Sequence, residues 1–191
     1  DVELPAFGSS FVVFTSQRDA GLAKQVASEK TEELVRQGRW SVAFQRDRGA
    51  PERPISVNDL TSWTEWPEEG VRYFSGTATY TANVSAPAFA NGEQVLLQFS
   101  DVREIARVKV NGHAAGTVWA KPLTLRVDPW LRRGENKIEI EVTNLWPNRM
   151  IGDLQLGVTR RYTETNITSY RANSPLLPSG LIGPVRWVIV R

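Results

Sequence analysis

Hydrophobic and polar positions follow a short repeat along much of this 191-residue chain. The segment from Phe99 to Trp146 holds three apolar runs, at 105–110, 123–127 and 138–142, and in the last two apolar and polar residues alternate. Alternation with a period of two gives a strand one buried face and one wet face. The first run leads into Asn111-Gly112, a pair that favours a two-residue hairpin turn because both central residues need φ > 0. The pattern predicts antiparallel strands joined by tight turns.

Further strands are expected on both sides of this segment. Residues 40–44 alternate, and in 72–84 apolar and threonine residues occupy opposite parities. Apolar runs at 95–99 and 185–190 complete the set, and within the irregular stretch 143–184 only 154–158 is expected to be a strand. About eight or nine short strands with turn signals between them predict an all-β chain, an antiparallel β-sandwich of the jelly-roll type.

The first 38 residues differ from the remainder. Residues 11–15 form a short apolar strand pattern, and 19–37 carry widely spaced apolar residues among Lys, Glu and Gln. This second pattern is weakly helical and ends at Gly38, a residue suited to follow a helix. We therefore predict an N-terminal strand and linker or helical segment over 1–38 and a β-sandwich domain over 39–191.

The composition and charge of the chain exclude several classes of partner and site. The formal net charge is only +2, from 23 Lys and Arg against 21 Asp and Glu, and the cations form no run with interleaved aromatic residues. The sequence therefore predicts no nucleic-acid partner. It predicts no membrane partner either, since no stretch approaches the roughly 20 apolar residues that a spanning helix needs. The chain has no cysteine, which excludes disulfides and thiolate metal sites. Because it begins at Asp1, we expect a piece of a longer protein or a mature fragment.

The sequence gives little evidence for catalytic residues. The single histidine, His113, follows the Asn111-Gly112 turn directly, where a solvated side chain is expected. Glycoside hydrolysis needs two carboxylates that face each other across the scissile bond. Glu65, Glu68 and Glu69 are close in sequence, but their spacing in a loop is no evidence for that geometry. We predict that the isolated chain is not an enzyme.

The chain has seven tryptophans, a large number for its length. Trp40 and Trp187 lie on strands with buried parity and are predicted to be core residues, and Trp130 is predicted to plug one end of the sandwich. Four others lie in or beside loops: Trp63, Trp66, Trp119 and Trp146. A rigid indole on a loop matches the apolar face of a sugar, but it can equally anchor the loop onto the sandwich. Both interpretations stay open. The turn after Trp146 favours the anchor, and the position of Trp119 after a hairpin favours the sugar platform.

Arginines gather in the irregular stretch 143–184. Arg149 lies four residues before Asp153, and Arg161 is next to Tyr162. The planar guanidinium can hold a carboxylate or neighbouring hydroxyls with two hydrogen bonds, which suits acidic sugars. The alternative is that these arginines pair with Asp153, Glu164 and backbone carbonyls and so fix a long loop in place.

Several motifs resemble known families of glycoside hydrolases. The VNG hairpin and the RRGENKIEIEV strand resemble the sugar-binding, galactose-binding-like β-sandwich of glycoside hydrolase family 2. Four longer motifs resemble the C-terminal region of the large bacterial α-L-rhamnosidases of glycoside hydrolase family 106: LTSWTEWPEEGVRYFSGTATY, VTNLWPNRMIGDLQL, RYTETN and SPLLPSGLIGPVRW. The resemblance covers roughly residues 38 to 191.

The resemblance implies a role beside a catalytic domain. In the rhamnosidases the catalytic carboxylates belong to an upstream barrel, so this chain is expected to be a non-catalytic carbohydrate-binding module of a bacterial, periplasmic or secreted enzyme acting on pectic polysaccharide. Its expected partners are an oligosaccharide or polysaccharide and the catalytic domain. Two alternatives remain: a structural accessory domain without sugar affinity, and a fragment completing an active-site rim. No cofactor is expected. The resemblance allows a structural calcium ion, with six to eight oxygen ligands that the sequence does not identify.

Overall fold

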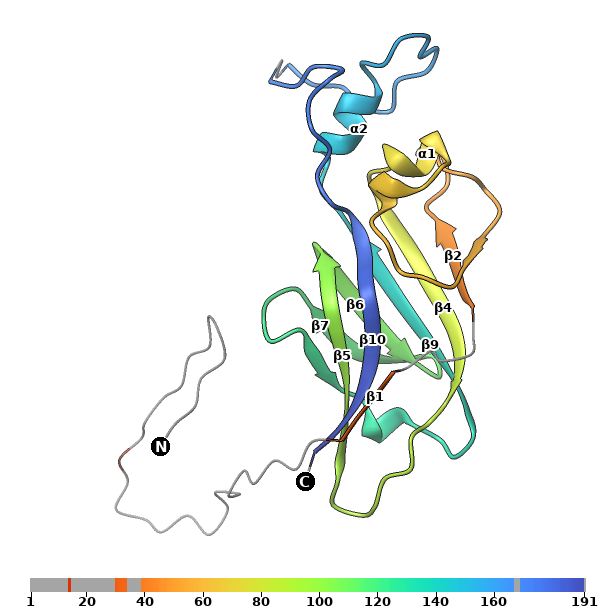
Figure 1. The fold of residues 1–191 in the computed structure, drawn as a ribbon, viewed down its shortest axis with the longest axis vertical. Helices are drawn as coiled ribbons and strands as arrows, with labels where there is room; N and C mark the ends of the chain where they lie inside the picture. The colour runs from red at the N-terminus through yellow and green to blue at the C-terminus, as the bar shows by residue number, and fades with distance from the viewer. Residues whose placement is uncertain (1–13, 15–29, 34–38, 167–168, 191) are drawn as a thin grey trace.

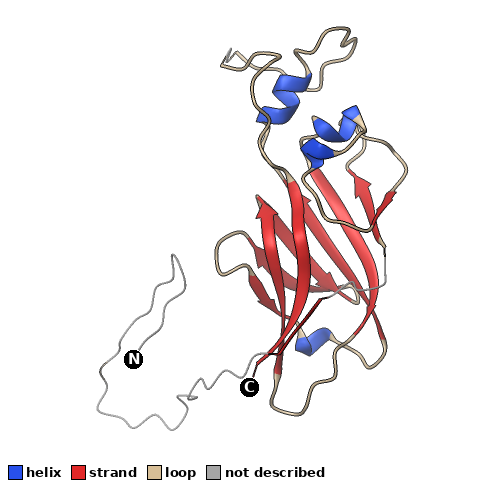
Figure 2. Ribbon diagram, viewed as in Figure 1, coloured by secondary structure: helices blue, strands red, loops and turns tan. Residues whose placement is uncertain are grey.

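The computed structural model describes residues 14, 30–33, 39–166 and 169–190. Within them, strands form two antiparallel sheets that pack face to face, as Figure 1 and Figure 2 show. The strands are β1 (Lys30–Glu33), β2 (Trp40–Phe44), β3 (Ile55–Val57), β4 (Thr77–Ser85), β5 (Gln94–Arg103), β6 (Ile105–Val110), β7 (His113–Val118), β8 (Thr124–Arg126), β9 (Glu135–Thr143) and β10 (Gly180–Val190). The short helices are η1 (Trp63–Glu65), α1 (Glu69–Arg72), η2 (Asp128–Trp130) and α2 (Pro147–Gly152).

The sheets have four and six strands. Their orders are β1-β10-β5-β8 and β3-β2-β4-β9-β6-β7. Neighbours in each sheet are often far apart in sequence, as when β10 pairs with β5 and β4 pairs with β9. The predicted all-β class and antiparallel sandwich are confirmed.

Alternation along the strands sets the core between the sheets. On β4 the residues Ala78, Tyr80, Ala82 and Val84 are buried, while the threonines between them face the other way. β9 buries its apolar residues in the same manner. Removing these side chains from water drives the two sheets together. The predicted core positions of Trp40 and Trp187 are confirmed, and Trp130 is half-buried against the core as the end plug.

The Asn111-Gly112 hairpin is confirmed. Both residues have positive φ, 52° and 82°, as the tight turn between β6 and β7 requires. The side chain of Asn111 also accepts a hydrogen bond from the backbone N of Lys137 at 3.0 Å and donates one to the carbonyl of Trp130 at 2.8 Å. This side chain therefore fixes the turn against β9 and the η2 end of the sandwich.

Two secondary-structure predictions are wrong. Lys30–Glu33, inside the predicted helix 19–37, form strand β1, because their backbone pairs with the edge of β10 and a weak helical pattern cannot compete with a sheet ladder. The predicted strand 154–158 is a series of turns, since Gln155 donates to the carbonyls of Ile151 and Ala172 and Gly157 has φ +82°. The rest of 19–37, and 11–15 apart from Phe14, lie outside the described residues.

A buried phenol links the two sheets. The Tyr80 hydroxyl accepts hydrogen bonds from the indole N–H of Trp63, at 2.6 Å, and from the backbone N of Leu181, at 3.2 Å. Burial disfavours the charged phenolate and raises the pKa of Tyr80 from 10.0 to about 12. Unfolding exposes the phenol and restores the ordinary value.

This difference predicts an alkaline loss of stability. The unfolded chain gives up the Tyr80 proton first, so its contribution is complete below about pH 10 and falls as the pH rises to about 12. The full loss is about 3 kcal/mol. Urea unfolding of the wild type and Tyr80→Phe across this pH range measures it. The variant is expected to lose less stability over the same range, and equal pH slopes for the two proteins would contradict the prediction.

Candidate functional site

The segment between β9 and β10 forms a lobe at one end of the sandwich (Figure 1). We use the name lobe for residues 145–166 and 169–179. Helix α2 lies at its base, and long loops without regular structure extend beyond the helix. Loops at the end of a rigid scaffold are common places for binding residues. The lobe is therefore the candidate location of a binding site.

Buried polar side chains join the two ends of the lobe. Asn148 donates to the carbonyl of Leu177 at 2.7 Å and accepts from its backbone N at 2.8 Å. It also donates to the Ser179 hydroxyl at 2.9 Å, which in turn accepts a hydrogen bond from Asn144 at 3.2 Å. The backbone N of Ser179 donates to Ser62, in front of η1. The lobe therefore enters and leaves the sandwich at one fixed point.

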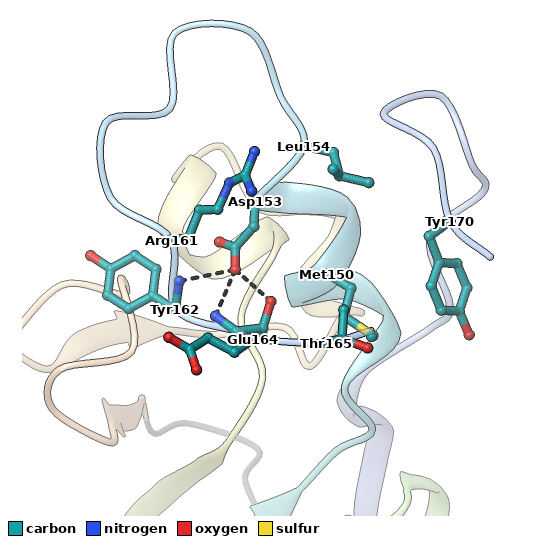
Figure 3. Close-up of a pocket in the computed structure, with 9 residues that line it drawn as sticks. Met150, Asp153, Leu154, Arg161, Tyr162, Glu164, Thr165 and Tyr170 are labelled. Carbon is teal, nitrogen blue, oxygen red and sulfur yellow. Dashed lines mark hydrogen bonds between the residues drawn. The ribbon is translucent and has the colours of Figure 1, made fainter. Parts of the chain in front are cut away.

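A buried ion pair organises the interior of the lobe. Arg149 Nε lies 2.9 Å from Asp153 Oδ1, one turn further along α2, although the two atoms are not aligned as a hydrogen bond. The other carboxylate oxygen accepts three hydrogen bonds, from the backbone N of Tyr162 and from the backbone N and hydroxyl of Thr163 (Figure 3). Asp153 therefore fixes the 162–163 backbone through Oδ2 and faces Arg149 through Oδ1.

The ring of Tyr162 is covered by cations. The guanidinium carbon of Arg149 lies 5.1 Å from its centroid and that of Arg160 lies 4.8 Å from it. Such contacts stabilise a cation over a ring face. Gly49 approaches from the loop after β2, where a Cβ would lie 3.0 Å from the Tyr162 ring. The same glycine packs on α1, because a Cβ at Gly70 would collide with its carbonyl oxygen. The lobe is thus seated on the sandwich.

Beside this ion pair the lobe has a cavity of about 890 Å³ that is open to solvent. Figure 3 shows its walls, which combine apolar, aromatic and charged side chains: Met150, Asp153, Leu154, Arg161, Tyr162, Thr163, Glu164, Thr165 and Tyr170. Arg161 and Glu164 are exposed and Tyr170 is half-buried. The cavity therefore offers hydrogen-bond donors, acceptors and an aromatic face, the groups that a polyhydroxylated ligand requires.

The structure separates the four loop tryptophans. Trp63 is 0% exposed and Trp66 is buried, and both rings meet Phe44 edge to face. A buried ring cannot stack on a sugar, so the platform interpretation is wrong for these two and they are anchors. Trp119 is 71% exposed and Trp146 is 57% exposed, which leaves a ring face free on each. Trp119 lies in the loop between β7 and β8, outside the cavity.

The predicted site arginines also separate into a buried one and an exposed one. Arg149 is 7% exposed and held by Asp153, as the loop-fixing alternative proposed, whereas Arg161 lines the cavity and is exposed. Tyr162 lies under two guanidiniums and also contributes to the wall. Tyr170 and Met150 are not among the site residues predicted from the sequence. Only the structure brings them to one wall, since they lie 20 residues apart in a region without periodicity.

Metal-ligand side chains do not cluster in the part of the chain that the structure describes. Nowhere in that part of the chain do three His, Cys, Asp or Glu side chains come together in a group that could hold a metal ion. A structural calcium ion stays a prediction. The same residues contain no helix with the length and hydropathy of a membrane span.

Two antiparallel sheets with a loop-borne cavity at one end define a galactose-binding-like sandwich. The family described as glycosyl hydrolase 2 galactose-binding domain-like matches residues 64–170, more than half of the chain. The chain belongs to this family. This match confirms the family resemblance of the motifs, and the domain resembles an accessory domain of glycoside hydrolases.

Known proteins agree with this assignment. The rhamnosidase from Novosphingobium sp. PP1Y has a TM-score of 0.79 and 38% identity, and the match covers 95% of this chain and 16% of that one. A curated protein of Formosa agariphila named "Putative beta-glucuronidase" is 37% identical over 174 residues, covering 78% of this chain and 15% of the relative. A β-glucuronidase from an uncultured Clostridium sp., with 16% identity and a TM-score of 0.59, shares the fold, and the match covers 94% of this chain and 30% of that one. The chain spans about a sixth of the first two proteins.

Proposed function

We propose that this chain is a non-catalytic carbohydrate-binding module of a rhamnosidase-like glycoside hydrolase, and that the cavity in the lobe is its sugar site. The observation that carries the proposal is the wall formed by Arg161, Glu164 and Tyr170 beside a buried ion pair. The proposed setting is a bacterial enzyme, periplasmic or secreted, that acts on pectic polysaccharide. The isolated chain would not be an enzyme, since Asp153 is committed to internal bonds.

The chemistry of the wall fits a sugar. Arg161 donates hydrogen bonds and Glu164 accepts them, so together they can bind hydroxyls of both polarities. Tyr170 offers an aromatic face to the apolar C–H surface of a sugar ring. The Arg149–Asp153 pair holds Tyr162 and Thr163 in place before any ligand arrives, and a preformed site loses less entropy on binding. A volume of about 890 Å³ falls within the range of ligand pockets.

Titration calorimetry with pectic oligosaccharides tests the proposal. We expect a Kd of about 10 μM to 1 mM, the range of a shallow, open site. Tyr170→Ala and Arg161→Ala should each weaken binding at least about tenfold, a loss of about 1.4 kcal/mol, by removing the stacking face or the donor. Both should leave unfolding stability within about 1 kcal/mol, because neither side chain belongs to the core.

The matched control is Arg171→Ala, which removes an exposed arginine from the same lobe that does not line the cavity. Its affinity should equal that of the wild type. If no oligosaccharide binds, or if the three variants bind equally, the cavity is not a sugar site. The structural accessory domain would then be favoured, and the apolar surface around the lobe supports that second candidate.

A further inference from the structure

Exposed large apolar side chains concentrate at one end of the molecule. Among the described residues, nearly all of them lie in the lobe or at the end of the sandwich that bears it: Ile105, Trp119, Leu145, Trp146, Leu154, Leu156 and Leu177. Only Phe14 and Phe89 of the same described set lie elsewhere, Phe89 in the loop between β4 and β5. Large exposed apolar patches mark interaction sites on protein surfaces.

The strand register brings three of these side chains together. Ile105 pairs with Thr143 of β9, and Ala106 pairs with Val118, the last residue of β7. Trp119, the residue after Val118, therefore comes next to Ile105. The inward positions are buried Ala106, Val118 and Asn144. Ile105 faces outward on β6 by alternation, and Trp119 and Leu145, just beyond the ends of β7 and β9, are exposed at the same lobe end of the six-stranded sheet. We call these three residues the apolar ridge.

The rest of that outer face is polar. Lys109 pairs with Glu141 at 2.6 Å and Lys137 pairs with Glu139 at 2.8 Å, on the strands that pass below the ridge. The threonines of β4 lie on the same face. The outer face is therefore polar along the strands and apolar only at the lobe end. An apolar patch bordered by polar residues is the usual composition of a protein–protein interface.

A protein surface is a better match for the ridge than a sugar. Sugar sites combine an aromatic face with convergent hydrogen-bonding groups. The ridge instead combines an indole with two branched aliphatic side chains. Such a set buries well against another apolar surface, with tryptophan as the residue type most enriched among binding hot spots.

We propose that the apolar ridge is the seat of a neighbouring domain of the same polypeptide. The length of related proteins supports this occupant. The match to the Novosphingobium rhamnosidase covers 95% of this chain but only 16% of that protein. A similar ratio holds for the Formosa relative, of which 15% is covered. This domain thus occurs inside chains about six times longer, with ample neighbouring structure to cover the ridge. The inference does not rest on sugar binding, since the ridge is separate from the cavity.

Cysteine labelling tests the proposal, because the chain has no cysteine of its own. Ala120→Cys places a thiol directly beside Trp119 without changing the ridge. Ala88→Cys, in the loop between β4 and β5 at the opposite end, is the matched control, and both alanines are exposed. Maleimide labelling of each site is followed by peptide mass spectrometry, in the isolated 191-residue chain and in the full-length polypeptide that carries it.

We expect the thiol at position 120 to react at least about tenfold more slowly in the full-length polypeptide, since a docked domain excludes solvent from its contact. The thiol at position 88 should react equally in both. Adding Ile105→Thr and Trp119→Ser to Ala120→Cys should restore fast labelling. Equal rates at position 120 in the two proteins would overturn the proposal, as would equal protection at both positions. Protection in the isolated chain that grows with its concentration would identify a second copy as the occupant and would also overturn it.

Discussion

Trp63→Ala is expected to destabilise the domain by about 3–5 kcal/mol, the range for truncating a fully buried tryptophan. The ring is completely buried, packs edge to face on Phe44 and Phe74, and donates to the Tyr80 hydroxyl at 2.6 Å. Gly180 lies against the ring with φ +94°, and a Cβ there would be 2.5 Å from Trp63 Nε1. A close contact of this kind leaves little room for the neighbours to collapse into the cavity that alanine creates.

Urea unfolding followed by far-ultraviolet circular dichroism measures the change. Trp119→Ala is the matched control, an exposed indole in a loop, and its stability should stay within about 0.5 kcal/mol of the wild type. A similar loss in both variants would contradict the exposed position of Trp119. Little loss at Trp63 would contradict its role as an anchor.

Asp153→Asn is expected to cost about 3–5 kcal/mol, because it leaves the buried guanidinium of Arg149 without a counter-charge. Whichever way the amide turns, its NH2 group faces either the donors of Tyr162 and Thr163 or the guanidinium of Arg149. The loss should be concentrated in the lobe. Hydrogen exchange is expected to show faster amide exchange in the lobe, with the amides of β4 and β9 less affected.

The matched control is Glu141→Gln, which breaks the partly exposed pair with Lys109 and should cost at most about 1 kcal/mol. A double-mutant cycle with Arg149→Met completes the test. Removing both charges should cost less than the sum of the two single changes, because no unpaired charge remains buried. Additive costs would mean that the pair contributes no coupling, contrary to its burial.

The strands were predictable because each carries its own evidence. Alternation on β4 and β9 specifies which side chains face the opposite sheet, and the Asn111-Gly112 pair specifies a tight turn without any distant contact. The possible pairing of Arg149 with Asp153 was visible too, because the two residues are close together in sequence. These features depend on neighbours in sequence, which is why the sequence alone identified them.

The remaining features depend on contacts between distant residues. Trp63 belongs to a single helical turn with no periodicity, and its burial comes from Phe44, Tyr80 and Gly180. Strand β1 exists because β10 presents an edge 150 residues further along. The cavity requires Arg161 and Tyr170 to line the same space from different parts of the irregular lobe. None of these partnerships leaves a pattern in the local sequence.

The hydrogen bonds of Asn148 and Ser179 fasten the start and end of the lobe to each other. A loop whose ends are already held together can change its length at low thermodynamic cost, since doubling the number of residues adds only about 0.6 kcal/mol of closure entropy. Insertions beyond this fastening would reshape the cavity without altering the register of a single strand. Related domains are therefore free to diversify what they bind through the lobe while keeping the same sandwich.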